Sequence, residues 1–379
     1  MTYKDKAWLE EQIEFVYQKI ITNLEQFEIK VPSAVSKDYV YPAVDNCDWT
    51  DSFWIGMLHL AQEYRYNDKI AETVVKQLAA FQNRLDEEIV VNHHDIGFLY
   101  SLSAIADYQM NERESSRAMA IQAADVLMRR YNETAGVIQA WGSLEDKEQQ
   151  GRMIIDCNMN LPLLYFASDE TGNPRYREAA KKHIKNAQKY LIRDDYSTFH
   201  TYYMDVDTGE PRFGQTAQGY SDESCWARGQ AWGIYGFPLS FNVTGDESLI
   251  ESAKNLADYF IQHLPEDYIS YWDLIFTDPS DEERDTSAAA IAACGLLELA
   301  KQLPLSDDKR AYYEVVAGKI MTSLAENYTT KNHPESNGLL TQGVYTKPGN
   351  HGVNECTLWG DYFYFEGLIR LYKVWYSYW

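Results

Sequence analysis

Helical runs of two kinds alternate along the chain, and this alternation restricts the possible folds more than any other feature of the sequence. One kind is amphipathic and charged, as around 180–183 and 307–310. The other kind is apolar and rich in small residues, as in 98–106, 160–168 and 288–299. A helix that is apolar on nearly all sides has to be buried, whereas an amphipathic helix lies at the surface. The sequence therefore predicts an inner and an outer layer of helices.

The breaks between these runs carry residues that end one helix and start the next. In Thr171-Gly172-Asn173-Pro174 and in Thr244-Gly245-Asp246, a glycine suits the end of a helix and the following residues suit the start of another. Short breaks between long helices indicate antiparallel hairpins. Together with the hydrophobic periodicity, they predict helices at 4–24, 51–66, 68–85, 96–110, 112–130, 157–170, 174–191, 226–243, 246–263, 285–301, 306–328 and 361–376.

The paired helices predict an all-α fold, an (α/α)6 toroid in which six inner helices are ringed by six outer ones. An open α-solenoid built from the same hairpins is the alternative. The long, chemically rich loops between the pairs favour closure. No linker rich in Pro, Gly or Ser and no block of like charge interrupts the sequence, so residues 1–379 are expected to form a single domain.

The overall charge excludes two kinds of partner. With a formal net charge of −23, the chain is not expected to bind nucleic acid or an anionic membrane surface.

No apolar stretch approaches the ~18 residues of a membrane span, and residues 1–6 lack the apolar core of a signal peptide. The five cysteines show no CxxC spacing and are expected to be buried thiols in a reducing cytosol. We therefore expect a cytoplasmic protein, and we expect it to be a monomer or a weak homodimer.

Aromatic, carboxylate and imidazole side chains are concentrated in the loops that precede the predicted inner helices. These loops are 45–50, 93–98, 155–158, 224–232, 271–273 and 359–361. In a toroid the inner helices all begin at the same end, so these loops converge on one mouth, where the helix dipoles favour an anion. The alternative for the aspartates in such loops is N-capping, which applies to Asp51, Asp95, Asp156 and Asp285.

Two of these aspartates are expected to take part in acid/base chemistry. Asp95 stands before Ile-Gly-Phe, and Asp156 lies between Ile155 and Cys157. An aspartate in an apolar wall loses hydration, so its pKa rises and it can carry a proton near neutral pH. A pair of such groups at one mouth suits acid/base chemistry on a glycoside.

Arg228 is a candidate for binding a carboxylate. It lies one helical turn before Trp232, and arginine holds carboxylates bidentately while tryptophan offers a flat face to a sugar. The alternative is an ion pair with a neighbouring acid such as Glu223. His200 and Gln218 lie in a long stretch with turn signals, and by this pattern alone they are more typical of surface or packing residues.

No metal and no cofactor is expected. The sequence has no HExxH, DxDxDG or CxxC motif, and it has no Walker or dinucleotide glycine pattern. His93 and His94 are adjacent, so they do not present two ligands on one face of a helix.

Four segments, in this order, carry a resemblance to a known family. They are HHDIGF at 93–98, IDCNMNLPLL at 155–164, SDESCWARGQAWGIYG at 221–236 and GVNECTLWGDYFYFEGL at 352–368. Together they resemble the unsaturated glucuronyl hydrolases of glycoside hydrolase family 88, over essentially the whole chain. WARGQAW is shared with the related unsaturated rhamnogalacturonyl hydrolases of family 105, which are the nearest alternative. HHDIGF and DCNMNLPLL favour the glucuronyl group.

The resemblance implies a metal-free (α/α)6 barrel that needs no cofactor. Its partner would be an unsaturated uronyl oligosaccharide released by a polysaccharide lyase, and its reaction would hydrate the C4=C5 enol ether of the terminal uronate. The resemblance implies that Asp156 is the catalytic acid and base and that Asp95 is the second carboxylate. It implies substrate-binding roles, with Trp232 as a stacking platform, for Trp49, His94, His200, Gln218, Arg228, Trp232, Thr346 and His351.

The loop at 346–351 bears on the substrate. Members of the family that favour sulfated fragments carry Ser and Lys in the loop before GVNE, whereas here the loop reads TKPGNH. We therefore expect unsulfated chondroitin or hyaluronan disaccharides, or fragments of a bacterial exopolysaccharide, as substrates. Two other classes of function remain as alternatives: a non-catalytic oligosaccharide-binding toroid and an α-solenoid scaffold for protein partners.

Overall fold

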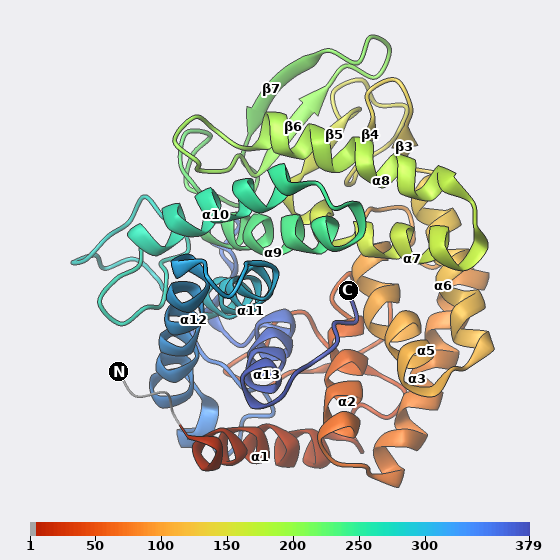
Figure 1. Ribbon diagram of the computed structural model, residues 1–379. Helices are drawn as coiled ribbons and strands as arrows, with labels where there is room; N and C mark the ends of the chain where they lie inside the picture. Colours follow the sequence, from red (N-terminus) through yellow and green to blue (C-terminus); the bar gives the residue numbers. More distant parts are fainter. Residues whose placement is uncertain (1–4) are drawn as a thin grey trace.

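The computed structural model describes residues 5–379, whose helices form a closed double ring (Figure 1). The inner ring consists of α2 (Ser52–Tyr64), α4 (Ile96–Tyr100) continued by a π-helical turn (Ser101–Ile105) and α5 (Ala106–Asn111), then α7 (Leu161–Thr171), α9 (Ala227–Thr244), α11 (Thr286–Gln302) and α13 (Leu358–Tyr372). The outer ring consists of α1 (Lys6–Asn23), α3 (Asp68–Asp86), α6 (Glu114–Met128), α8 (Pro174–Asn186), α10 (Glu247–Gln262) and α12 (Asp308–Asn327). Because α13 packs against both α11 and α2, the last inner helix meets the first. The predicted (α/α)6 toroid is confirmed, and the open α-solenoid is wrong.

Most of the predicted helix boundaries are confirmed, because capping residues fix them. Gly172 and Gly245 end α7 and α9 with φ angles of 71° and 67°, in the left-handed region that favours glycine. Asp246 then accepts a hydrogen bond from Ser248 N at 3.1 Å and starts α10. The predicted start of the first helix at residue 4 lies outside the described residues.

The end of the chain differs from the prediction. The last helix, α13, begins and ends earlier than the predicted 361–376, and residues 373–379 form an extended tail. Trp375 Nε1 donates to Glu63 Oε1 at 3.2 Å, and Glu63 lies in the last turn of α2. The tail is thus held by a side chain that is distant in sequence. Helical periodicity reflects only near neighbours, so it did not predict where α13 ends.

The tail ends inside the ring of inner helices, where Figure 1 places the C-terminus. The ring of Trp379 stacks on Phe363 of α13, with centroids 6.0 Å apart and 13° between the planes. Its Nε1 donates to Glu366 Oε2 at 3.1 Å. Since the inner helices start at the mouth, their last turns and this tail lie at the opposite end. The tail therefore covers the far opening of the toroid.

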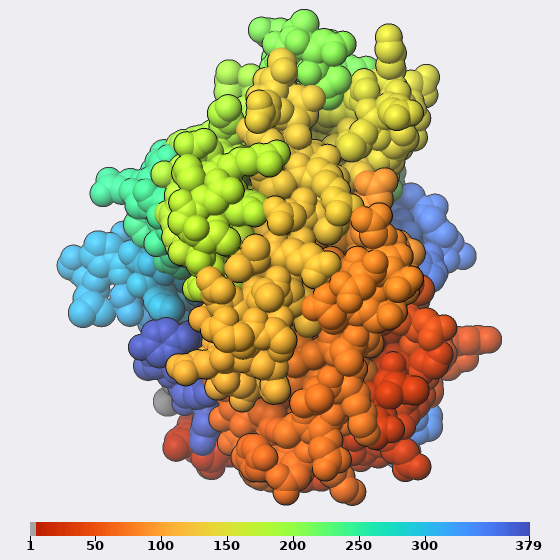
Figure 2. Space-filling view, turned by 90° about the vertical axis from the view of Figure 1, so that its right-hand side faces the viewer, coloured from red at the N-terminus to blue at the C-terminus, as the bar shows by residue number. Residues whose placement is uncertain are grey.

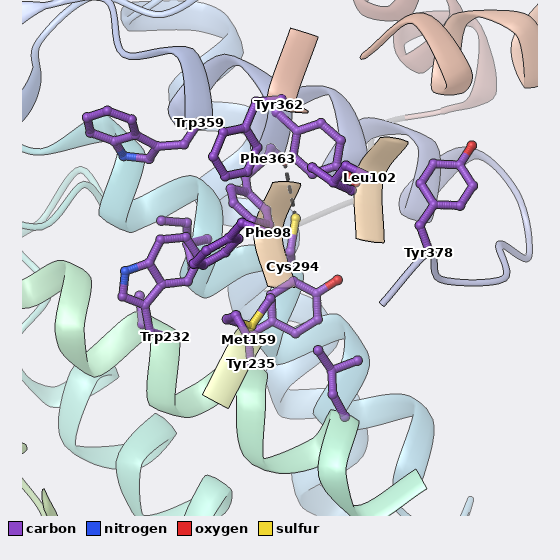
Figure 3. Close-up of a cluster of buried hydrophobic side chains, with 14 of the residues drawn as sticks. Phe98, Leu102, Met159, Trp232, Tyr235, Cys294, Trp359, Tyr362, Phe363 and Tyr378 are labelled. Atoms are coloured by element: carbon purple, nitrogen blue, oxygen red, sulfur yellow. Dashed lines mark hydrogen bonds between the residues drawn. The ribbon is translucent and has the colours of Figure 1, made fainter. Parts of the chain in front are cut away.

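An aromatic cluster fills the axis of the toroid between the mouth and the tail (Figure 3). Phe98, Trp232, Tyr235 and Phe363 have no exposed surface, and they come from α4, α9 and α13. The ring centroid of Trp232 lies 5.2 Å from that of Phe98 and 5.4 Å from that of Phe363. The inner ring is thus a packed core.

Short strands decorate the helical rings. They are β1 (Val31–Pro32), β2 (Ala43–Val44), β3 (Tyr131–Asn132), β4 (Val137–Ile138), β5 (Arg152–Ile154), β6 (Thr201–Met204), β7 (Pro211–Gln215), β8 (Gly343–Thr346) and β9 (His351–Glu355). β5, β6 and β7 form an antiparallel sheet in which Ile154 faces Thr201, so Asp156 and His200 lie at the same end of two paired strands. Figure 2 shows outer helices α3, α6 and α8 side by side, with the β6–β7 hairpin projecting beyond them.

The cysteines partly follow the prediction. Cys157, Cys225, Cys294 and Cys356 are buried free thiols, but Cys47 is exposed, so the expectation that all five are buried is wrong. Cys47 lies in the loop before α2, which is open to solvent. Across residues 5–379, no helix combines the length and the apolar character that a membrane crossing requires.

Candidate active site

The loops before the inner helices meet at one end of the toroid, as predicted. Arg228, in the first turn of α9, donates from Nη2 to the carbonyl oxygen of Tyr345 at 2.7 Å. The Tyr345 hydroxyl accepts a hydrogen bond from Trp49 Nε1 at 2.9 Å. The Trp49 ring in turn lies 5.7 Å from that of Phe98. Contacts of this kind connect the loops before α2, α4 and α9 and the β8–β9 hairpin into one site.

Asp156 has the properties expected of an acid at this site. It lies in a short 3-10 helix (Ile155–Met159) that follows β5, and its buried Oδ1 has no hydrogen-bond partner. Burial and the charge of Asp95 raise its pKa, His94 and Arg228 lower it, and the net result is a pKa of about 7. This raised pKa agrees with the proton-carrying role expected of Asp156, which stays a prediction.

Asp95 differs from the prediction. Its Oδ1 lies 3.2 Å from His94 Nε2, and its Oδ2 lies 3.4 Å from His93 Nδ1. Burial acts to raise the pKa of Asp95, but the two imidazoles outweigh it and hold the pKa below the usual range. The expected rise was wrong, because the sequence pattern shows the apolar residues after Asp95 and not the direction in which the two rings turn.

The two carboxyl groups are therefore different chemical species near neutral pH. Asp95 is ionised, and its negative charge is one of the causes that keep the proton on Asp156. Two neighbouring carboxyls with separated pKa values are a common arrangement in acid/base catalysis, because one donates a proton while the other stays charged.

The capping alternative holds for one of the four aspartates. Asp285 accepts a hydrogen bond from Ser287 N at 3.0 Å at the start of α11. Asp51 and Asp95 occupy N-cap positions without a side-chain capping bond, and Asp156 lies inside its short helix. Asp51 instead pairs with the buried Arg84 at 3.3 Å. Capping thus does not account for the two candidate catalytic aspartates.

Both terminal nitrogens of Arg228 form hydrogen bonds within the protein. Nη1 donates to Asp285 Oδ2 at 3.1 Å, and Nη2 donates to Gln218 Oε1 at 2.6 Å. The ion-pair alternative for Arg228 is therefore confirmed, although its partner is Asp285 and not the exposed Glu223. Arg228 also packs beside the Trp359 ring at 5.0 Å.

The two predicted tryptophans differ in access. Trp49 is half-buried and lies against Trp359, with ring centroids 5.3 Å apart. Trp232 has no exposed surface and is enclosed by Phe98 and Phe363, so it has no free ring face and the stacking interpretation is wrong. Its buried Nε1 has no partner, which leaves a hydrogen-bond donor beneath the site.

The β8–β9 hairpin contributes two more of the predicted residues, which flank its tip. Thr346 is half-buried, and its Oγ1 accepts a hydrogen bond from Gly349 N at 3.3 Å. His351 is exposed, and its ring lies 5.1 Å from that of Tyr345. Lys347 forms an ion pair with Glu283. The hairpin is thus a wall of the mouth built around Tyr345.

Sequence reasoning missed Tyr345 and the pairing role of Asp285. Tyr345 links Trp49, Arg228 and His351, and burial raises its pKa to about 12. Tyr345 directly precedes Thr346, which was a predicted site residue. The chain has 29 tyrosines, however, and nothing in the sequence distinguishes this one from the others. Among residues 5–379, no group of three or more His, Cys, Asp or Glu side chains is arranged to hold a metal ion.

The elements that carry the two aspartates are in close contact through a glycine. A Cβ placed on Gly97 would lie 2.3 Å from Asn160 Cα, and Phe98 N donates to Asn160 Oδ1 at 2.7 Å. Asp95 precedes Gly97 by two residues, and Asn160 ends the segment that holds Asp156. This contact therefore sets the spacing of the two carboxyl groups.

Gly97→Ala is expected to separate the two segments. Because the added methyl meets backbone atoms, the variant should lose about 1–3 kcal/mol of stability, and kcat/KM should fall by on the order of 10²-fold. Gly318→Ala is the matched control, since nothing lies within 4 Å of a Cβ there, in α12. Denaturant unfolding and substrate turnover measure both effects. A Gly97→Ala variant with wild-type kcat/KM would contradict the spacing role.

Comparisons with known proteins agree with this architecture. The sequence matches Glycosyl Hydrolase Family 88 over residues 23–371. It is 44% identical over 367 residues to the unsaturated chondroitin disaccharide hydrolase of Streptococcus pneumoniae, which covers 97% of this chain and 92% of that protein. The crystal structure of unsaturated glucuronyl hydrolase from Streptococcus agalactiae superposes with a TM-score of 0.97 at 44% identity, covering 100% of this chain and 95% of that one. A mutant of the S. agalactiae enzyme, complexed with dGlcA-GalNAc6S, gives a TM-score of 0.90 at 41% identity over 100% and 95% of the two chains.

Proposed function

Because the chain belongs to Glycosyl Hydrolase Family 88, we propose that it is an unsaturated glucuronyl hydrolase in which Asp156 is the catalytic acid. The enzyme removes the 4,5-unsaturated glucuronate residue from the non-reducing end of oligosaccharides that polysaccharide lyases produce. One observation carries the catalytic role: the buried Asp156 carboxyl has a pKa of about 7 and an oxygen without a partner.

The reaction that suits this carboxyl is hydration of the C4=C5 double bond. An enol ether is protonated at carbon, so the first step needs an uncharged acid placed over C4. Asp156 gives its proton to C4, and the resulting carboxylate takes a proton from the water that adds at C5. The hemiketal formed then opens the ring and expels the remaining sugar. One carboxyl thus acts first as an acid and then as a base.

Asp95 has a different proposed role. Its ionised carboxylate, held by His94 and His93, can accept hydrogen bonds from substrate hydroxyls while its charge keeps Asp156 protonated. Because Asp95 is not a nucleophile in this scheme, the carboxyl spacing that distinguishes ordinary retaining and inverting glycosidases does not apply.

We further propose a preference for unsulfated substrates. The ammonium group of Lys347, the one cation in the loop 346–351, is paired with Glu283, which reduces its availability to a sulfate. The complex of the S. agalactiae mutant contains a 6-sulfated disaccharide, so the comparison of sulfated with unsulfated substrate is informative. Thr346 and His351, at the same loop, are the proposed contacts to the sugar beneath the uronate.

A two-substrate assay tests the function. Loss of the ultraviolet absorbance of the enol ether is expected with unsaturated hyaluronan or chondroitin disaccharide and not with an unsaturated rhamnogalacturonan disaccharide. Turnover of the last substrate alone would indicate the family 105 activity. Binding of the disaccharides without any loss of absorbance would indicate a non-catalytic toroid. The family match and the named relatives support neither of these alternatives.

The pKa of Asp156 predicts the pH profile. The acid has to be protonated in the free enzyme, so kcat/KM is expected to be constant below about pH 7 and to fall about tenfold per pH unit above it. Asp95, with its lowered pKa, remains ionised over this range. Initial rates between pH 5 and 9 measure the profile. A kcat/KM that increases through pH 7 would show that Asp156 has to be ionised first.

We also propose that the enzyme acts in the cytoplasm as a monomer or a weak homodimer. Five cysteines that are all free suit a reducing compartment. The net charge of −23 keeps copies of the chain apart at low ionic strength.

A further inference from the structure

His200 is held as one neutral tautomer by the main chain. Its Nδ1 accepts hydrogen bonds from Ala217 N at 2.9 Å and from Gln218 N at 3.2 Å. Amide nitrogens only donate, so Nδ1 has to be an unprotonated acceptor and the ring hydrogen has to be on Nε2. Burial, with the charge of Arg228 next in importance, lowers the pKa of His200 to about 3. Arg228, His94 and Arg152 are the charged or titratable groups around the ring.

The Nε2–H of His200 is free for a ligand. Nε2 is buried and has no partner in the protein. The main-chain oxygen of His200 accepts from Ile155 N at 3.2 Å, which places His200 beside the segment of Asp156. The ring packs against Trp226, with centroids 4.4 Å apart, so it cannot rotate freely. A neutral N–H donor is thus fixed next to the proposed catalytic acid.

Gln218 is oriented by the same loop. Its Oε1 accepts from Arg228 Nη2 at 2.6 Å. Because arginine has donors only, this contact requires the oxygen to face Arg228 and leaves the amide NH₂ of Gln218 as a second donor. The loop therefore sets two donors, the His200 Nε2–H and the Gln218 NH₂, for oxygen atoms of the sugar.

The 216–224 loop, which carries Gln218 and the amides bound to His200, is held by the buried carboxylate of Asp273. Asp273 is fully buried, and its Oδ2 accepts from Tyr220 N at 2.9 Å and from Ser224 Oγ at 2.7 Å. Its Oδ1 accepts from Ile275 N at 3.1 Å. The turn between the His200 contacts and Asp273 is tight, since a Cβ on Gly219 would lie 2.7 Å from Thr216 Oγ1 and 3.2 Å from Asp273 Oδ2. Displacement at Asp273 is therefore transmitted to the amides of Ala217 and Gln218.

We propose that Asp273 is a positioning residue that, through the 216–224 loop, locks His200 as an Nε2–H donor to the substrate. This inference rests on the proposed function, because that function supplies the substrate that His200 meets. Asp273 itself contacts neither the substrate nor Asp156 in this scheme. Without Asp273, the amides of Ala217 and Gln218 no longer donate to Nδ1 of His200. The imidazole then samples both neutral tautomers and can be protonated.

The test is Asp273→Asn, which keeps the size of the side chain but replaces one acceptor oxygen by a donor. The KM for unsaturated hyaluronan disaccharide is expected to rise on the order of tenfold, with a smaller change in kcat. Nitrogen NMR of the imidazoles gives an independent readout, with the His200 signals assigned by their loss in His200→Gln. The wild type should show a single Nε2–H tautomer from pH 5 to 8, and Asp273→Asn should show a tautomer mixture that protonates in that range.

Asp246→Asn is the matched control, because Asp246 also accepts from a backbone N–H and a serine hydroxyl, those of Ser248, but does so at the surface-exposed start of α10. It should change neither KM nor the His200 signals. If Asp273→Asn fails to fold, Ser224→Ala removes one donor to the same Oδ2 and should shift both readouts in the same direction by less.

Two results would overturn the proposal: His200 signals that stay those of the wild type in a folded variant, whatever its KM, or a tautomer mixture with the KM of the wild type. Failure of the proposed function is recognised separately, as a wild type that turns over no unsaturated uronide while its His200 tautomer still depends on Asp273.

Discussion

Asp156→Asn is expected to lower kcat by about 10²–10⁴-fold with little change in KM, the range that general acid/base groups contribute. The amide has the size of the carboxyl but cannot deliver a proton to C4, while the side chains around it are unchanged. The measurement is loss of enol-ether absorbance at saturating substrate, with binding of the unsaturated disaccharide followed by calorimetry. A variant that retains wild-type kcat would remove Asp156 from the mechanism.

The same substitution should increase stability at alkaline pH. Burial raises the folded-state pKa of Asp156 from 3.8 to about 7, so the folded protein binds this proton more tightly than the unfolded chain does. The contribution to stability is complete below the unfolded pKa and is lost as the pH rises through about 7. Asn has no such loss, so the variant should be about 2–4 kcal/mol more stable than the wild type at pH 8.

Asp361→Asn is the matched control, since burial also raises the pKa of Asp361 to about 7. In contrast to Asp156, its oxygens are occupied, by Leu339 N at 2.9 Å, Leu340 N at 2.8 Å and the Tyr41 hydroxyl at 3.0 Å. The amide cannot serve all three donors, so this variant should lose stability and keep the turnover of the folded fraction. The two variants thus separate catalysis from folding at two aspartates of similar pKa.

Arg370→Met is expected to cost about 3–5 kcal/mol of unfolding free energy, because it leaves two buried carboxylates without their cation. Arg370 Nη1 donates to Glu298 Oε2 at 2.8 Å, and its Nε donates to Glu366 Oε1 at 2.8 Å. Both glutamates have no exposed surface. The measurement is urea unfolding at pH 7, and Glu298→Gln in the Arg370→Met background should recover part of the loss by removing one buried charge.

Arg65→Met provides the comparison at the surface. Arg65 Nη2 lies 2.6 Å from Glu14 Oε2, but both side chains are exposed, so its loss should cost at most about 1 kcal/mol. Equal losses at the two arginines would show that burial of the Arg370 group has no special effect. Because Glu366 also accepts from Trp379, a destabilised Arg370→Met variant is expected to release the tail first.

The sequence predicted the parts of this structure that depend on local pattern. The two-layer toroid follows from helices that are apolar on all sides, and glycines such as Gly172 and Gly245 mark where helices end. Asp156 could be selected because its apolar neighbours are adjacent in the chain. These features need only near neighbours, which a single sequence displays.

The features that the sequence did not predict depend on partners distant in the chain or on the directions in which neighbouring side chains turn. Arg228 pairs with Asp285, 57 positions away, and Tyr345 meets Trp49 across 296 positions. The lowered pKa of Asp95 depends on the turn that brings both neighbouring imidazoles onto its oxygens. The first two contacts result from the packing of separate elements and the third from the local direction of two side chains, so no spacing in the sequence indicates them.

Because the tail fills the far opening, the toroid has a single entrance. A saccharide chain cannot thread through such a ring, so cleavage has to proceed from a free end and never from the middle of a strand. The released uronate also has to depart by the route through which the next substrate arrives. Exchange of product for substrate at this entrance, and not only the chemical step, then contributes to the turnover rate.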